Sequence, residues 1–122
     1  MKIYVAHSRD MDYINELYNP LRAESFFKAH ELILPHENNN NCYNERNFYK
    51  NIDIIIAECS EPSTGLGIEI GWAYDDNKKI YCLYKKGKRY SDSIRLITNN
   101  FYEYSNSKEI IEIIREIINK ET

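Results

Sequence analysis

The chain has 122 residues, a formal net charge of −3 and 43% hydrophobic residues. This length predicts a single domain over residues 1–122, with room for one sizeable core but not for a separate substrate lid. The basic residues are scattered outside the segment 85–89, which argues against binding of a long nucleic acid. No apolar run approaches the roughly 20 residues that span a bilayer, so we expect no membrane partner.

Cysteine usage bears on the cellular compartment. The three cysteines, at positions 42, 59 and 82, form no CxxC pair. An odd number of cysteines in a chain without a recognisable signal peptide predicts reduced thiols and a cytoplasmic location.

Apolar runs and turn residues alternate along the chain in a regular order. Strands are expected at residues 2–7, 30–36, 52–58, 79–84 and 101–104. Helices are expected at residues 10–28 with an interruption near Pro20, and at 44–51, 65–76, 91–98 and 108–120. This alternation predicts an α/β fold, a Rossmann-like or flavodoxin-like three-layer sandwich around a five-stranded parallel sheet.

The segment 52–72 contains the clearest candidate site. Its apolar run at 53–57 predicts a strand buried on both faces, which Pro62 separates from the next helix. Ser63 and Thr64 can cap that helix, and Gly65 and Gly67 let backbone N–H groups approach an anion. We therefore expect a phosphate-binding turn here.

Glu69 lies six residues after Ser63, roughly 9 Å farther along the helix axis. A nucleoside monophosphate fits this span, with its phosphate at the helix start and its sugar carbon C1′ near Glu69. A carboxylate beneath C1′ can stabilise an oxocarbenium-like centre or form a covalent glycosyl-enzyme. A second group must help the base to leave; Glu45, Glu37 and Glu58 are the candidates, and proximity to Glu69 would decide among them.

Other polar residues are expected at the carboxyl ends of strands, where ligands bind in parallel sheets. His7 and His36 end neighbouring strands, so either can contact phosphate or base. No third residue has recognisable metal-ligand spacing, so we expect no metal and no other cofactor. Tyr4 is either a core residue or a wall beside the sugar.

The segments AHSRD, LPHE and DIIIAECSEPSTGLGIEIGWA resemble the nucleoside 2-deoxyribosyltransferase superfamily, particularly its 2′-deoxynucleoside 5′-phosphate N-hydrolase branch. The resemblance covers most of the chain and is strongest in the central segment. It implies that Glu69, in the pattern Gly65-Leu66-Gly67-Ile68-Glu69-Ile70-Gly71, is the nucleophile. It also implies that Ser63 contacts the 5′-phosphate.

Further roles follow from the same resemblance. It implies substrate contacts for Tyr4, Ser8 and His36, and for a serine of a neighbouring subunit that corresponds to Ser91 or Ser93. The helping acid of the family, an aspartate, corresponds to Glu45, with Glu37 as the alternative. The chain also lacks the glycines that are usual after the first strand.

The leading hypothesis is hydrolysis of the N-glycosidic bond of a nucleoside 5′-monophosphate, with a 2′-deoxynucleotide preferred. The alternatives are a deoxyribosyltransferase that passes the sugar to a second base, and a nucleotide-binding module without turnover. The small domain and the resemblance together predict a homodimer or a larger homo-oligomer with shared sites.

Overall fold

The computed structural model describes residues 1–37 and 46–122. Its centre is a five-stranded sheet with the order β2-β1-β3-β4-β5, in which every neighbouring pair is parallel. The strands are β1 (Lys2–His7), β2 (Glu31–Ile33), β3 (Ile54–Glu58), β4 (Lys79–Lys85) and β5 (Phe101–Tyr104). The predicted α/β sandwich is confirmed, and the strand order is that of flavodoxin-like folds.

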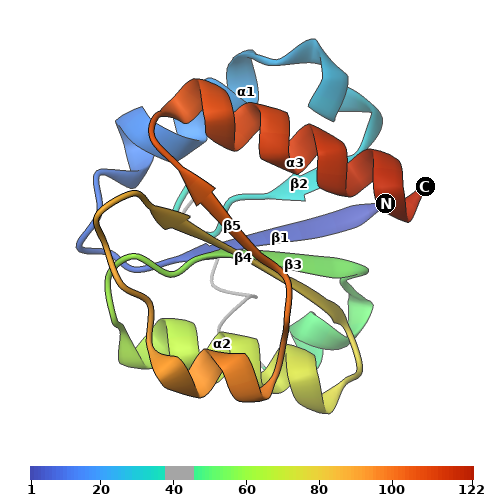
Figure 1. The fold of residues 1–122 in the computed structure, drawn as a ribbon. Helices are drawn as coiled ribbons and strands as arrows, with labels where there is room; N and C mark the ends of the chain where they lie inside the picture. The colour runs from blue at the N-terminus through green and yellow to red at the C-terminus, as the bar shows by residue number, and fades with distance from the viewer. Residues whose placement is uncertain (38–45) are drawn as a thin grey trace.

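Helices cover both faces of the sheet (Figure 1). On one face lie the π-helix η1 (Ile14–Tyr18), α1 (Asn19–Ala23) and α3 (Ser107–Glu121); on the other lie α2 (Thr64–Asp75) and the 3-10 helices η4 (Arg46–Asn51) and η5 (Asp92–Leu96). A further 3-10 helix, η2 (Ser25–Ala29), leads into β2. Among these described helices, none is both long and apolar enough to cross a membrane.

The central strand β3 shows why the sheet needs both helical layers. All five of its residues are buried. Ile54 and Ile56 pack into the core on the α3 side, whereas Ile55 and Ala57 pack into the core on the α2 side. A continuous apolar run therefore forms two cores, because successive side chains of a strand point to opposite faces.

Most predicted elements differ from the observed ones by one or two residues at an end, and two differ more. The expected interruption near Pro20 lies elsewhere: Pro20 comes directly after the wide turn of η1, the helical conformation continues through Ala23, and the chain leaves it at Glu24. The second strand is three residues long rather than seven, and Pro35, which has no N–H to donate to a ladder, follows soon after it.

The strand order creates a crevice at the carboxyl ends of β1 and β3. The chain after β1 leads to η1 and α1 on one face, whereas the chain after β3 leads to α2 on the other. Such a topological switch point leaves an opening between neighbouring strands, where open α/β sheets bind ligands. The fold thus places residues 7–10 opposite the start of α2.

The core on the α3 side should be sensitive to loss of volume. Ile114 of α3 is fully buried, so Ile114→Ala is expected to lower the free energy of unfolding by about 2–5 kcal/mol. Denaturant-induced unfolding measures the change. Glu116→Ala, on the exposed side of the same helix, is the control and should change stability by about 0.5 kcal/mol or less. Equal effects of the two substitutions would contradict this account of the core.

Candidate active site

A cavity of about 490 Å³ opens at the switch point. Its walls are the segment after β1, the loop after β2 and the first two turns of α2. The lining residues are His7, Ser8, Arg9, Asp10, Pro35, His36, Pro62, Ser63, Thr64, Gly65, Leu66 and Glu69. The volume suits a small molecule, and the cavity lies where the fold predicts a ligand.

The start of α2 forms the anion-binding end of this cavity. Ser63 has extended backbone angles and caps the helix, with its Oγ accepting the Leu66 N–H at 3.4 Å. The N–H groups of Thr64 and Gly65 belong to the first turn, where the helix itself supplies no acceptor. Free N–H groups and the positive end of the helix dipole favour a bound phosphate.

Glu69 projects from the second turn of α2 toward two buried phenols. Tyr4 of β1 and Tyr49 of η4 are 0% and 1% exposed, and their hydroxyl oxygens are 3.2 Å apart. Burial raises the pKa of Glu69 to about 7, although hydrogen bonds from the two phenols and the charge of Arg9 lower it. Near neutral pH, the ionised and the protonated form of this carboxyl are therefore both populated. The ionised form can act as a nucleophile, and a pKa near the working pH suits acid-base catalysis.

Arg9 is a site residue that the sequence did not single out. It lines the cavity with an exposed side chain, and its positive charge lowers the pKa of both Glu69 and His36. The sequence feature that could have identified it is a positively charged side chain two residues after the end of β1. Arg9 supplies positive charge to the same cavity as the start of α2.

Two histidines form the wall opposite α2. His7 is buried, with Nδ1 2.9 Å from the carbonyl oxygen of Ser8 and Nε2 2.6 Å from the hydroxyl of Tyr18. Burial lowers the pKa of His7 to about 4, so its ring is neutral at physiological pH. The pKa of the half-buried His36 is also lowered, mainly by burial and then by the charge of Arg9.

The structure brings most of the predicted site residues together. Ser8, His36, Ser63, Gly65 and Glu69 line one cavity, and Tyr4 lies beneath Glu69. The roles predicted for them stay predictions.

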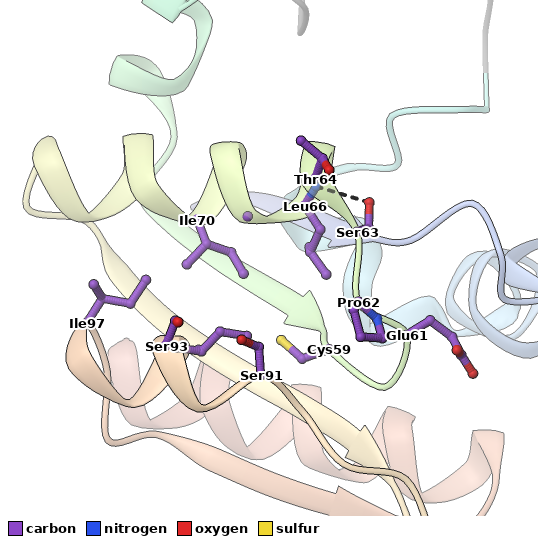
Figure 2. Close-up of a pocket in the computed structure, with 12 residues that line it drawn as sticks. Cys59, Glu61, Pro62, Ser63, Thr64, Leu66, Ile70, Ser91, Ser93 and Ile97 are labelled. Atoms are coloured by element: carbon purple, nitrogen blue, oxygen red, sulfur yellow. Dashed lines mark hydrogen bonds between the residues drawn. The ribbon is translucent and has the colours of Figure 1, made fainter.

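Gly67 and Ser91 lie elsewhere, in a neighbouring cavity of about 440 Å³ between α2 and η5. Figure 2 shows Ser91 and Ser93 of this cavity across from Ser63, which both cavities share.

Two of the three candidates for the second acid lie away from Glu69. Glu37 forms a bidentate ion pair with Arg22, with both nitrogen–oxygen distances 2.7 Å. Glu58 is buried and accepts hydrogen bonds from the backbone N–H and hydroxyl of Ser60 and from the hydroxyl of Tyr104. Neither lines the cavity that contains Glu69. Glu45 lies outside the described residues, so its role stays a prediction.

Comparisons with known proteins bear on this site. No family model matches the chain. Over 45 residues, 35% of this chain, it is 44% identical to the 5-hydroxymethyl-dUMP N-hydrolase of Tetraodon nigroviridis and covers 32% of that protein. Over 54 residues, 41% of this chain, it is 41% identical to a Nematostella vectensis protein provisionally named 2′-deoxynucleoside 5′-phosphate N-hydrolase 1 and covers 37% of it. The matches thus span about a third of the length of these curated relatives.

Solved structures give a longer match. A CMP N-glycosidase from Clostridium botulinum superposes with a TM-score of 0.66 and 26% identity, over 94% of this chain and 99% of the other. A 2-deoxyribosyltransferase from Bacillus psychrosaccharolyticus has the same fold, with a TM-score of 0.53 and 18% identity over 90% of both chains. The comparisons confirm the predicted resemblance to nucleotide N-hydrolases, and the match to a 2-deoxyribosyltransferase shows that the chain shares its fold.

Desolvation of Glu69 predicts a stability that depends on pH. The folded protein raises the pKa of this carboxyl from 4.5 to about 7. Its favourable contribution to the free energy of unfolding is therefore complete below a pH of 4.5 and is lost as the pH rises through about 7. Glu69→Gln keeps the side-chain shape but does not titrate. We expect this variant to melt at a higher temperature than the wild type at a pH of about 8, and the difference to shrink toward a pH of about 5. A difference independent of pH would contradict the burial of this carboxyl.

Proposed function

We propose that this chain hydrolyses the N-glycosidic bond of nucleoside 5′-monophosphates, with 2′-deoxynucleotides preferred, and releases the free base and the sugar 5-phosphate. The observation that carries the proposal is the half-buried carboxyl of Glu69, held by two phenols in a cavity whose other end is a helix N-terminus. The names of the N-hydrolase relatives and of the CMP N-glycosidase support the same reaction class.

The substrate is oriented by its charge. The 5′-phosphate binds at Ser63 and the first-turn N–H groups of α2, with Arg9 supplying a counter-charge. The sugar then lies along α2 with C1′ at Glu69, because the two residues are about 9 Å apart along the helix axis. The wall that contains His36 faces the nucleotide from the opposite side of the cavity.

Glu69 acts as the nucleophile in two steps. Its ionised carboxylate attacks C1′ while the bond from C1′ to the base nitrogen breaks, and the base leaves with that electron pair and a proton. A water molecule then attacks C1′ and gives a proton to the deprotonated proton donor, which releases the sugar 5-phosphate and restores both carboxyl groups to their starting states. Tyr4 and Tyr49 hold the carboxylate in place by hydrogen bonds. Glu45 is the proposed donor of the proton to the base.

Assembly and location belong to the same proposal. We propose a cytoplasmic homodimer or larger homo-oligomer, in which Ser91 or Ser93 of one subunit contacts the phosphate bound by another. Analytical ultracentrifugation measures the assembly, and a monomer at all accessible concentrations would contradict this part of the proposal without affecting the chemistry at Glu69.

The reaction can be tested directly with purified protein. Incubation with a panel of ribo- and deoxynucleoside monophosphates that includes CMP and 5-hydroxymethyl-dUMP should release free base, detected by chromatography. Glu69→Gln should lower kcat by about a thousandfold or more, because it removes the nucleophile but keeps the shape of the side chain.

Three outcomes would count against hydrolysis by Glu69. Base release only when a second free base is added would indicate a transferase. Nucleotide binding without any release of base would indicate a binding module. Unchanged activity of Glu69→Gln would leave hydrolysis in place but exclude Glu69 as the nucleophile.

The role of Ser63 in phosphate binding predicts a change in KM. Ser63→Ala should raise KM for a nucleoside monophosphate about tenfold and change kcat less, because one hydrogen bond to a charged group is lost. The substitution also removes a helix cap, which costs about 1 kcal/mol of stability. Asn106→Ala removes the cap of α3 at a residue that does not line the cavity, and it is the matched control. An equal rise in KM for both variants would show that lost stability, not lost phosphate contact, is the cause.

A further inference from the structure

A buried tyrosine lies behind the histidine wall of the cavity. Tyr18 is 4% exposed, and its hydroxyl oxygen is 2.6 Å from Nε2 of His7 and 3.0 Å from the backbone nitrogen of His36. Tyr18 does not line the cavity, and the proposed reaction makes no use of it. Its hydroxyl nevertheless joins the two residues that form the wall opposite α2.

The direction of each hydrogen bond in this bridge follows from its partners. The carbonyl of Ser8 can only accept, so Nδ1 of His7 carries the ring proton and donates it. Nε2 of the neutral ring is then an acceptor, and the Tyr18 hydroxyl donates to it. The oxygen of the same hydroxyl accepts the backbone N–H of His36. The bridge therefore runs in one direction, from His36 through Tyr18 to His7.

A wide helical turn brings Tyr18 to this position. Tyr18 is the last residue of the π-helix η1, where the Asn19 N–H bonds to the Ile14 carbonyl. In an α-helix, residues five positions apart point about 140° away from each other, whereas the wider turn returns them to nearly the same side. Tyr13 and Tyr18 are five apart, and both rings contact His7, with centroid distances of 4.6 and 5.2 Å. Such turns occur frequently at functional sites.

We propose that Tyr18 is a positioning residue of the nucleotide pocket, which uses its hydroxyl to fix the backbone of His36 against the ring of His7. The proposal rests on the proposed function, because it takes the wall at His36 to contact the nucleotide. The loop that carries His36 follows the short edge strand β2, so only a few ladder hydrogen bonds hold it in the sheet. The Tyr18 hydroxyl supplies an attachment to β1 that the sheet does not.

Removal of this one hydroxyl tests the proposal. Tyr18→Phe keeps the ring and its packing, and it should raise KM about tenfold with little change in kcat, because the wall binds substrate but does not take part in bond breaking. In the Glu69→Gln background, which blocks turnover, the Kd for CMP and for 5-hydroxymethyl-dUMP should rise by the same factor. Calorimetric titration measures both.

Tyr81→Phe is the matched control. The Tyr81 hydroxyl donates to Glu121 at the end of α3, and neither residue lines the cavity at Glu69. This variant should lose melting temperature in the same way as Tyr18→Phe but keep the wild-type KM. Equal KM values for wild type, Tyr81→Phe and Tyr18→Phe would overturn the proposal.

A double-mutant cycle with His36→Ala separates positioning from general destabilisation. If Tyr18 acts through His36, Tyr18→Phe should change KM and Kd less than about twofold in the His36→Ala background. A full tenfold effect in that background would overturn the proposal.

The Kd measurements distinguish failure of the proposed hydrolase from failure of the role proposed for Tyr18. Nucleotide binding without base release would refute the hydrolase alone, and the double-mutant cycle measured by Kd would still decide the role of Tyr18. A wild-type protein that neither binds nor cleaves these nucleotides would overturn both.

Discussion

Partial burial of the Glu69 carboxyl is the constraint on which the rest of the site depends. A carboxyl that ionises readily in solvent is here packed against the sheet, and burial raises its pKa to about 7. The phenols of Tyr4 and Tyr49 offset part of that cost by donating hydrogen bonds to the charged form. The result is a carboxylate with few competing partners and a defined orientation, which suits a nucleophile better than a fully solvated or fully neutral group.

The fold meets this constraint through the topology of its sheet. The order β2-β1-β3-β4-β5 opens a crevice between β1 and β3, and α2 begins at its edge. One helix therefore contributes both ends of the site, with a phosphate-binding N-terminus at Ser63 and a carboxyl two turns later at Glu69. The opposite wall is built from the ends of β1 and β2, which Tyr18 links. Binding and chemistry thus depend on elements that pack on different faces of one sheet.

Local sequence patterns predicted the parts of this arrangement that depend on residues close together in the chain. The spacing of Ser63 and Glu69 along one helix is fixed by helical geometry, so the sequence predicted their relation correctly. The strand at Phe101–Tyr104 was predicted with its observed ends, because a short run rich in aromatic residues between polar turns favours a strand.

The contacts that tune the site depend on tertiary packing instead. The sequence gives no sign that Tyr49, twenty residues before Glu69, lies beneath it, because that contact depends on how η4 packs against α2. The π-turn that aims Tyr18 also has no pattern of its own, since the same residues could form an ordinary α-helical turn. The buried hydrogen-bond network around Glu58 shows the same limit: a strand-end glutamate looked like a candidate acid, but it accepts hydrogen bonds from Ser60 and Tyr104.

The stereochemistry of the reaction at C1′ tests the central role of Glu69 most directly. When the reaction runs in aqueous methanol, some of the glycosyl-enzyme should be intercepted by methanol, and NMR of the methyl glycoside 5-phosphate reports the configuration at C1′. Two successive displacements through Glu69 predict the β configuration, the same as in the nucleotide. A product with only the α configuration would show a single displacement by solvent and would contradict a covalent role for Glu69.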